Sequence, residues 1–414
     1  MMFNAALAQA APDYVRTISF EGNEVTEESL LRQQMFITEG DEMDIKKVER
    51  SVQAIMDLGL FSDVSYYLAE DYLASDAEAH AVDLVILLEE KFYLFVLPRV
   101  RIDDDELHLG LQLHWDNIAG LNHSMRLLVE DRGSKQGVQE TRQRFSYEYP
   151  NVNGSAYSMG VLADKTNTVD ENEIDAVIDR RDSRLGMDVT RWLNADGRTQ
   201  GWFIGFGGEL RQRENRVISG SLNSETLDAV LLRFDYGYSV VHEYAYNRGG
   251  KEFGYDLEVS DDRFGSNTEY VRHLLYYRSY YRFKSRPGDN LNVQTLFGHA
   301  TADILGDAAF SLGSSADLRG FDNNRYEGNT LILVNMEYLT PTDFHKPLRY
   351  VVFMDVGSVY DSFREIRHEN LKTGVGFGIR WKIPRFVKLD LRVDVGYAIN
   401  DEDYHISFGA RHAF

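Results

Sequence analysis

The sequence predicts a transmembrane antiparallel β-barrel of about 16 strands, preceded by a small α+β domain. Three observations lead to this fold class. Apolar and polar residues alternate with a period of two from about residue 96 to residue 414, in segments of roughly ten residues. The chain holds 24 Tyr and 23 Phe, mostly near the ends of these segments, where a barrel carries its aromatic girdles. No window of about 18 residues is free of charge, which argues against a transmembrane helix.

The composition excludes several classes of function. The 66 acidic residues outnumber the 44 basic ones and give a net charge of -22, whereas a nucleic-acid partner requires a basic stripe. Cysteine is absent, which excludes structural disulfides and cysteine-ligated zinc. The acidic runs at residues 103–106 and 170–175 suit either a divalent cation or solvated loops, and solvated loops are the favoured interpretation. We therefore predict no metal site, no cofactor and no nucleic-acid partner.

Residues 1–12 are interpreted as the remnant of a signal peptide or as a disordered segment. Ala8 and Ala10 form the A-x-A pattern of a secretory cleavage site, and Pro12 follows. Only "MMFN" stands where the charged and apolar regions of a signal should be. A chance match in an Ala-rich tail stays an alternative.

Residues 13–92 predict a small α+β domain in the order strand, helix, helix, strand, strand. Thr26 is expected to cap the first helix. Asp44 caps the second helix, which ends at Gly59. One apolar face of that helix comprises Ile45, Val48, Val52, Ile55 and Met56. The closing strands are "FSDVSYYL" (61–68) and "AVDLVILLEE" (81–90).

Residues 93–414 form the predicted barrel, in which apolar side chains face lipid and polar ones face the interior. In "KLDLRVDVGY" (388–397) the outward positions are Leu389, Leu391, Val393 and Val395, and the inward ones are Asp390, Arg392 and Asp394. Inward charges of both signs suit a hydrated lumen. A soluble β-sandwich is the alternative, but its strands would be shorter and less regular. Because every backbone group needs a partner in lipid, the sheet is expected to close on itself.

Two acidic side chains are expected to meet inside this barrel. The lipid face of one strand is formed by Ile332, Val334, Met336 and Tyr338. Glu337 therefore points inward. By the same parity, the next strand directs Asp355 and Gly357 inward. The two carboxylates repel each other unless a cation lies between them.

A loop near residues 306–328 can supply that cation. If the loop folds into the lumen, Arg319 can bond both carboxylates through its fork of donors. Gly320 would permit a close turn beside it, and Phe321 would wedge against the wall. Alternatively Arg319 faces water, because a four-residue "LRGF" is common.

The first and last strands are expected to meet at a weak seam. Pro98 in "FVLPRVRID" cannot donate to a ladder, and Gly409 in the last strand packs nothing. Alternatively, Pro98 merely begins its strand. The terminal Phe414 resembles the end signature of bacterial outer-membrane barrels.

Two sets of motifs resemble known families. "ISFEGNEVTEESLLRQQM", "EGD" and "VERSVQAIMDLGLFSDVSYYL" resemble a POTRA domain, the periplasmic module of BamA-type proteins. "LRGF" (318–321), "EGN" (327–329), "MEYLTP" (336–341) and "FMDVG" (353–357) resemble, in this order, the late-barrel motifs of the BamA/TamA superfamily. Together the two resemblances cover essentially the whole chain.

The resemblance implies a bacterial outer-membrane protein with its POTRA domain in the periplasm. It also implies that the seam between the first and last strands is a lateral gate, at which an incoming strand pairs with the exposed strand edge. In that family a loop arginine docks against acidic groups inside the barrel, which implies this role for Arg319, Glu337 and Asp355. POTRA domains generally recruit unfolded client chains or partner proteins by pairing a strand at a sheet edge, here along residues 61–68. Either sheet edge is compatible with the sequence.

The function expected from these features is insertion or assembly of proteins in the outer membrane through the lateral seam, without covalent chemistry. The alternative is a secretion pore of the same superfamily. Such pores typically have two POTRA modules and a plug helix, for which the few residues before Val15 leave too little room. An enzymatic barrel is disfavoured, because no spaced Ser partner accompanies the candidate histidines His242, His273 and His412, and a patatin-type lipase would need a G-x-S-x-G motif.

Overall fold

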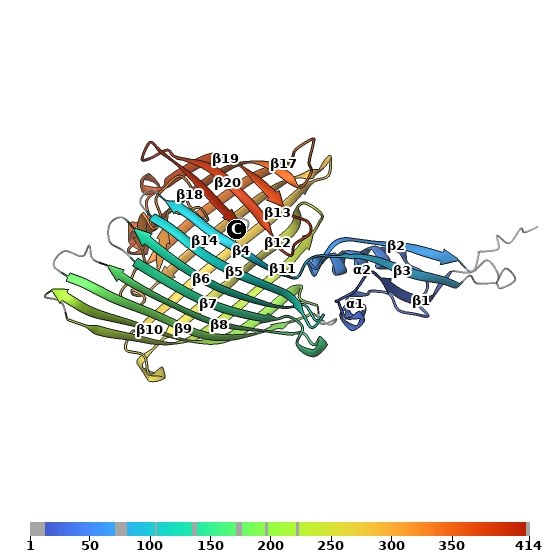
Figure 1. Cartoon of the computed structure of the whole chain (residues 1–414), viewed down its shortest axis with the longest axis horizontal. Coiled ribbons are helices and arrows are strands. Elements are labelled where there is room, and N and C mark those ends of the chain that lie inside the picture. The colour runs from blue at the N-terminus through green and yellow to red at the C-terminus, as the bar shows by residue number, and fades with distance from the viewer. Residues whose placement is uncertain are drawn as a thin grey trace, which may run out of the picture.

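The computed structural model comprises a small α+β domain beside a large curved β-sheet (Figure 1). It describes residues 13–70, 81–103, 106–134, 139–170, 176–194, 198–220 and 223–410. Residues 1–12, the candidate His412 and the terminal Phe414 lie outside the described residues. So do half of the acidic run 103–106 and most of the run 170–175.

The small domain has the predicted order of elements. They are β1 (Tyr14–Glu21), α1 (Glu28–Gln34), α2 (Ile45–Asp57), β2 (Phe61–Glu70) and β3 (Ala81–Glu90). In the sheet, β3 lies in the middle, parallel to β1 and antiparallel to β2. Both helices pack on this sheet through one buried apolar cluster that includes Leu31, Val48, Ile55, Leu84 and Ile86. An α+β domain of this size is held together by that cluster.

The ends of the helices agree with the sequence prediction at α2 and differ from it at α1. Asp44 caps α2 by accepting hydrogen bonds from the backbone N–H groups of Lys46 and Lys47. The prediction that Thr26 caps α1 is wrong, because α1 begins at Glu28 and the buried Thr26 hydroxyl instead accepts a hydrogen bond from Asn117 Nδ2 at 2.9 Å. A bond to the barrel thus replaces a local cap.

Ile45 also departs from its predicted place on the apolar face of α2. It is the first residue of the helix and 42% exposed. Val48 and Ile55, which lie one and three turns further on, are completely buried. The apolar cluster therefore covers α2 from its second turn onward.

The large sheet contains 16 strands, the predicted number, and every neighbouring pair is antiparallel. The strands are β4 (Leu94–Asp103), β5 (Glu106–Ile118), β6 (His123–Ser134), β7 (Gln139–Tyr149), β8 (Tyr157–Asp170), β9 (Ala176–Trp192), β10 (Gly201–Gly220), β11 (Glu225–Glu243), β12 (Arg248–Ser260), β13 (Tyr270–Phe283), β14 (Arg286–Ala300), β17 (Thr330–Pro341), β18 (Leu348–Tyr360), β19 (Lys372–Lys382), β20 (Asp390–Ala398) and β21 (Asp403–Ala410). Neither helix of the described chain is long and apolar enough to cross a membrane.

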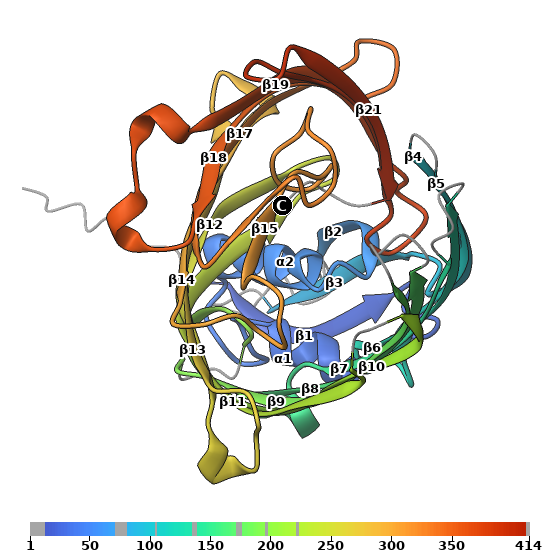
Figure 2. The same ribbon diagram turned by 90° about the vertical axis from the view of Figure 1, so that its left-hand side faces the viewer.

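The loop between β14 and β17 carries a hairpin of its own, β15 (Phe310–Leu312) and β16 (Tyr326–Gly328). Seen along the barrel, β15 and the adjoining loop lie inside the ring of strands (Figure 2). The interior of this end of the barrel is therefore occupied by protein.

The alternation of exposed and buried residues follows the predicted parity along the strands. On β18, Val352 and Met354 are exposed, whereas the residues that follow each of them, Phe353 and Asp355, are buried. Leu389 is an exception, since it was expected to face lipid with Leu391 but is buried. It precedes the first residue of β20, so the parity of that strand does not apply to it.

The sheet curves into a ring whose two end strands are β4 and β21 (Figure 2). Among the described residues no ladder joins these two strands. Closure of the sheet by hydrogen bonds between these two strands therefore stays a prediction.

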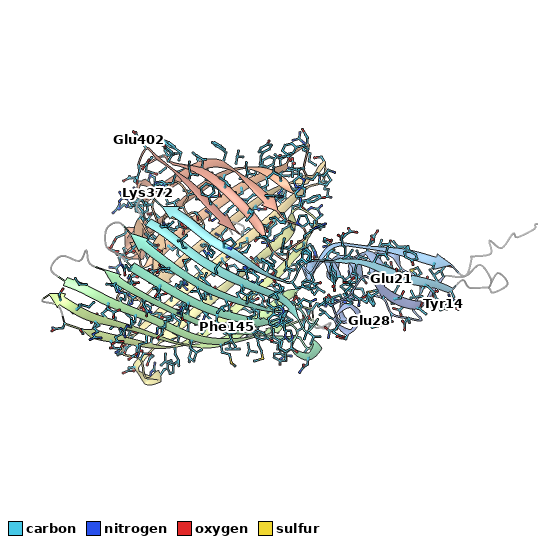
Figure 3. The ribbon with its side chains drawn as sticks, viewed as in Figure 1. Tyr14, Glu21, Glu28, Phe145, Lys372 and Glu402 are labelled. Atoms are coloured by element: carbon cyan, nitrogen blue, oxygen red, sulfur yellow. The ribbon has the colours of Figure 1, made fainter. Side chains whose placement is uncertain are left out.

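The small domain is attached to one end of the barrel (Figures 1 and 3). The carboxylate of Asp57, at the end of α2, accepts hydrogen bonds from Gln200 Nε2 at 2.8 Å and from the backbone N–H of Glu243 at 2.9 Å, and contacts His242 Nδ1 at 2.8 Å. Lys372 and Glu402 lie at the opposite end of the barrel (Figure 3). The contacts of Asp57 orient the barrel with respect to the domain.

Candidate functional site: a luminal arginine cluster beside an open seam

Arg319 lies inside the barrel and bonds both of the carboxylates that strand parity directs inward. Its Nε and Nη2 donate to the two oxygens of Asp355 at 2.6 and 2.7 Å, and its Nη1 donates to Glu337 Oε1 at 2.5 Å. The backbone N–H of Arg319 adds a bond of 3.1 Å to Asp355. Arg319 is 2% exposed and Asp355 is 0% exposed. A fork of donors that meets a carboxylate in two places fixes both position and orientation.

The network continues across two further strands. Arg380 on β19 donates to the same oxygen of Glu337 at 2.7 Å and to Asp394 Oδ1 on β20 at 2.6 Å. Arg392 Nη1 lies 4.0 Å from the second oxygen of Asp394. Three arginines thus face three carboxylates in the luminal arginine cluster, which comprises Arg319, Glu337, Asp355, Arg380, Arg392 and Asp394.

Two neighbours complete the environment of Arg319. Asn335, one strand away from Asp355, donates to its Oδ1 at 2.8 Å. The ring of Phe353 lies under the guanidinium, with the central carbon 3.6 Å from the ring centre. Cation–π contact and hydrogen bonds therefore hold the same side chain from two directions. Loss of one partner of such a buried pair typically costs about 3–5 kcal/mol.

Glycines in the wall let the loop approach this closely. Gly320 has φ = +94°, and a Cβ there would lie 2.8 Å from the backbone N of Ala398. On the wall, a Cβ at Gly396 would lie 2.7 Å from the backbone N of Gly320, and one at Gly374 would overlap the carbonyl oxygen of Arg319. The loop backbone therefore rests directly on β19 and β20, where side chains are missing.

Phe321 packs away from the charges. With Leu318 it belongs to a buried apolar cluster that also contains Phe310, Leu312, Leu331 and Leu333. Gly357 lies against the same cluster, since a Cβ there would be 3.2 Å from Leu312 Cδ1. Gly357 thus leaves room for the hairpin that carries the loop.

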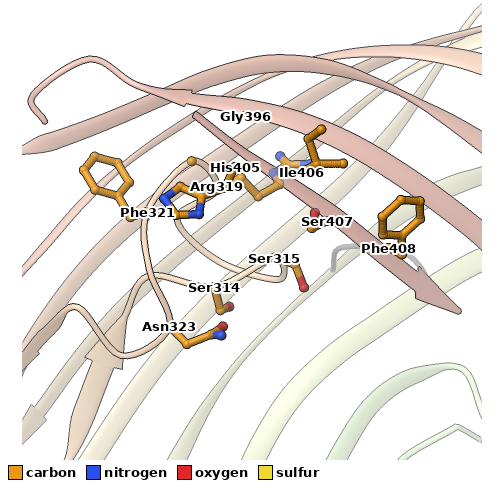
Figure 4. Close-up of a pocket in the computed structure, with 11 residues that line it drawn as sticks. Ser314, Ser315, Arg319, Phe321, Asn323, Gly396, His405, Ile406, Ser407 and Phe408 are labelled. Carbon is orange, nitrogen blue, oxygen red and sulfur yellow. The ribbon is translucent and has the colours of Figure 1, made fainter. Parts of the chain in front are cut away.

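A small cavity of about 50 Å³ separates the loop from the last strand. Ser314, Ser315 and Arg319 line one side, and His405 and Ser407 of β21 line the other (Figure 4). Arg392 Nη2 bridges toward the loop by donating to Ser315 Oγ at 3.0 Å. The luminal arginine cluster thus lies next to the strand that forms one edge of the seam.

The seam residues occupy the two end strands. Pro98 is the fifth residue of β4 and lies opposite Leu111 of β5, so it does not begin its strand. Gly409 of β21 lies opposite Arg392 of β20. A Cβ at Gly409 would lie 2.6 Å from Arg392 Nε. The missing side chain makes space for the arginine.

The two sides of the seam are held together at the end nearest the small domain. The backbone N–H of Phe92 donates to Arg385 O at 2.7 Å. The ring of Phe386 lies 5.5 Å from that of Phe92 and 5.0 Å from that of Phe95. We call these three rings the aromatic clasp. It connects the start of β4 to the turn between β19 and β20 and leaves β21 out.

Sequence reasoning assigned no role in the cluster to Arg380 or Asp394, although parity placed Asp394 inward. The signal that would have linked them is the register of the strands. Gly378 lies opposite Asp394, and Arg380 lies opposite Arg392. Register depends on pairing between distant segments, which a single sequence does not reveal.

The described histidines of the enzymatic alternative are not paired with a serine. His242 contacts the carboxylate of Asp57, and His273 Nδ1 lies 2.6 Å from the hydroxyl of Tyr255. Neither arrangement activates a serine hydroxyl.

Comparisons with known proteins agree with this architecture. A family model described as the Omp85 superfamily domain matches residues 117–414, and one described as the surface antigen variable number repeat, a POTRA domain, matches residues 14–91. Outer membrane protein assembly factor BamA of Nitratidesulfovibrio vulgaris is 25% identical over 153 residues. That match covers 33% of this chain and only 19% of the length of the relative.

Solved structures share the fold at low sequence identity. BamA from Haemophilus ducreyi lacking POTRA domains 1–3 has a TM-score of 0.56 and 14% identity, and the alignment covers 96% of this chain and 84% of that one. CdiB from Acinetobacter baumannii has a TM-score of 0.62 and 14% identity, and the alignment covers 96% of this chain and 73% of that one. CdiB from Escherichia coli has a TM-score of 0.55 and 10% identity, and the alignment covers 99% of this chain and 91% of that one. Since the family model spans most of the barrel, the chain belongs to the Omp85 superfamily and is an outer-membrane protein with a periplasmic POTRA domain.

Proposed function

We propose that this protein helps to insert or assemble proteins in the outer membrane, through the seam between β4 and β21. The observation that carries the proposal is the pair of sheet edges, which have no ladder partner within the described chain. An edge strand presents unpaired N–H and C=O groups, so an extended client segment can add to it by β-augmentation. The mechanism needs hydrogen bonds and no covalent step.

The luminal arginine cluster supports this proposal because it braces the wall beside the seam. Its members link the loop to β17, β18, β19 and β20. With these strands fixed, β21 can part from a client or receive one without disturbing the rest of the sheet. The brace therefore confines the movement to one edge.

The POTRA domain offers a second place for an extended chain. In the order β1-β3-β2, the outer side of β2 pairs with no strand of the described chain. We propose that an unfolded client or a periplasmic partner pairs along β2 before it reaches the seam. The domain lies at the barrel end where the aromatic clasp holds the start of β4.

The occupied lumen supports insertion at the seam over passage of a soluble protein through the barrel. A chain passing along the lumen would have to displace the loop and break the four hydrogen bonds that Arg319 makes to Glu337 and Asp355. A chain that enters at the seam leaves them intact. The cluster is thus compatible with lateral entry while it stays assembled.

Locking the seam tests the proposal. The chain has no cysteine, so Val96→Cys with Phe408→Cys places the only thiols on the outer faces of β4 and β21, where a bismaleimide can join them. The control, Val393→Cys with Phe408→Cys, joins β20 to β21 at a pair that is already in register. Both proteins are reconstituted in liposomes, and the folding rate of a small client barrel is measured.

The proposal predicts that the seam cross-link abolishes the acceleration of client folding, whereas the control cross-link leaves it unchanged. Full acceleration with a locked seam would contradict it. Conductance that persists with a locked seam and depends on a soluble secreted substrate would favour the pore instead.

A further inference from the structure

A pocket on the outer wall of the barrel lies far from the seam. It has a volume of about 710 Å³ and opens between β11, β12 and β13. These are the middle strands of the 16-stranded order, so the pocket is as remote from β4 and β21 as the sheet allows. It has no part in the luminal arginine cluster or in the seam.

Most of the strand residues that line the pocket have outward parity, whereas Tyr280 and Arg282 have the inward parity of Arg278. Tyr236 of β11 and Leu275 of β13 are exposed on the lipid side. Tyr238 and Val240 share the parity of Tyr236, and Tyr281 shares that of Leu275. Lys251 lies opposite both Val240 and Ser279 and therefore faces the same side.

The pocket lies at the periplasmic end of the barrel. The turn after β11 follows Glu243, whose backbone N–H is bonded to Asp57 of the POTRA domain. Tyr244 in this turn lines the pocket, as does Lys284 in the turn after β13. In the membrane, the pocket therefore lies at the level of the lipid headgroups of the periplasmic leaflet.

The charge of the pocket is opposite to that of the chain. The chain carries a net charge of -22, yet the lining contains Lys251, Arg282 and Lys284 and no described acidic residue. Within the described chain neither lysine forms an ion pair, and Arg282 stacks on the ring of Tyr244 with its central carbon 3.4 Å from the ring centre. The adjacent Glu252 points to the other face and binds Arg278.

Aromatic and apolar side chains complete the lining on the membrane side. Tyr238, Val240, Tyr281 and Phe283 form this part of the pocket. Tyr281 and Phe283 make an edge-to-face pair with ring centres 5.1 Å apart. Such residues are typical of the membrane interface, where one end of a ring is wet and the other is in hydrocarbon.

We propose that this pocket binds the headgroup of an anionic glycerophospholipid of the periplasmic leaflet. Lys251 and Lys284 would contact the phosphate, and the acyl chains would run along the outward faces of Tyr238 and Val240. Each cation near a membrane surface strengthens attraction to an anionic lipid, so two lysines together account for a change in affinity of roughly tenfold to thirtyfold. The inference does not depend on the proposed insertion activity.

The test uses the full chain in detergent, stripped of lipid and titrated with dioleoyl phosphatidylglycerol, with binding followed by native mass spectrometry. We expect Lys251→Gln with Lys284→Gln to weaken binding roughly tenfold to thirtyfold. Ser279→Trp, which fills the pocket without changing charge, is expected to have a similar effect. The control is Lys346→Gln, an exposed lysine in the turn after β17 that lies outside the pocket and forms no ion pair in the described chain.

Three results would overturn the proposal. These are wild-type affinity in both pocket variants, an equal loss in Lys346→Gln, and displacement of the lipid by millimolar inorganic phosphate, which would assign the site to a free anion. Phosphatidylcholine is expected to bind weakly in all variants. Heat-modified gel mobility shows that each variant is folded, so a failure to bind is not a failure to fold.

Discussion

The guanidinium of Arg319 holds Asp355 by both carboxylate oxygens, with Nε–Oδ2 and Nη2–Oδ1 distances of 2.6 and 2.7 Å. This relationship connects a loop to the wall of the barrel 36 residues further along the chain. Both side chains are out of contact with solvent. Because a charge buried without its partner is costly, the loop can leave the lumen only if the whole network rearranges.

Arg319→Ala should release the loop while the barrel stays inserted. The substitution leaves Glu337 and Asp355 buried with fewer partners, at a cost of about 3–5 kcal/mol. Limited proteolysis should cut the chain within residues 306–328 faster than in the wild type, and client folding should slow. Arg325→Ala is the matched control. Arg325 is on the same loop but half-exposed, and its Nε lies 3.9 Å from Asp401 Oδ2. Equal cleavage of Arg319→Ala and wild type would contradict this role.

Gly396→Ala should displace the same loop without touching a charge. The added methyl group would lie 2.7 Å from the backbone N of Gly320, closer than packing permits. The expected outcome is loop cleavage similar to that of Arg319→Ala, with strands still formed. The control is Gly133→Ala in β6, where a Cβ has no neighbour within 4 Å. If cleavage at the loop is the same in both alanine variants, the loop does not depend on close contact at β20.

Phe386→Ala should loosen the seam at its periplasmic end. It removes the ring that contacts both Phe92 and Phe95, and each aromatic pair is worth about 0.5–1.5 kcal/mol beyond the buried area. In a protein that also carries Val96→Cys and Phe408→Cys, the rate at which a bismaleimide joins the two cysteines should change. The melting temperature should fall. Phe344→Ala, which removes an exposed ring from another turn, should change neither. An unchanged cross-linking rate in Phe386→Ala would show that the clasp does not control the seam.

Lys91 gives the protein a measurable dependence on alkaline pH. Burial, reinforced by the nearby Lys382, lowers the pKa of the Lys91 amine from 10.5 to about 8. Between these two values the unfolded chain binds the proton and the folded chain does not, so the contribution of Lys91 to stability rises with pH. Below about pH 8 the amine is charged in both states and its burial is unfavourable.

The corresponding measurement compares unfolding of wild type and Lys91→Met in urea from pH 7 to pH 10.5. The free energy of unfolding of Lys91→Met should exceed that of the wild type by the largest amount at neutral pH. This excess should shrink as the pH rises above 8. Since other groups titrate equally in both proteins, the difference isolates Lys91. A difference that is constant over this range would contradict a lowered pKa.

The strand count and the facing of each strand could be predicted from the sequence because alternation is a local property. Glu337 and Asp355 are inward for that reason alone. Their connection to Arg380 and Asp394 could not be predicted from periodicity, since it depends on the stagger of β17 to β20. The same limit applies to Gly409, whose role follows from the side chain of Arg392 on the neighbouring strand.

The junction between the domains was the other feature beyond the reach of local patterns. Thr26 has the residue type and position of a helix cap, yet its hydroxyl is used by Asn117 of the barrel. Likewise Asp57, at the end of α2, is bonded to three barrel residues that follow it by more than 140 positions. Where a polar side chain has both a local and a tertiary partner available, local propensity does not decide between them.

The central claim is that client strands enter at the edge of β4 or β21, and stalled-client cross-linking tests it most directly. A photoreactive residue is placed at Val96 on β4, at Ile406 on β21, or at Phe206 on the outer face of β10. We predict covalent adducts with a stalled client from Val96 and Ile406 and none from Phe206. Adducts of equal yield from all three positions would contradict entry at the seam.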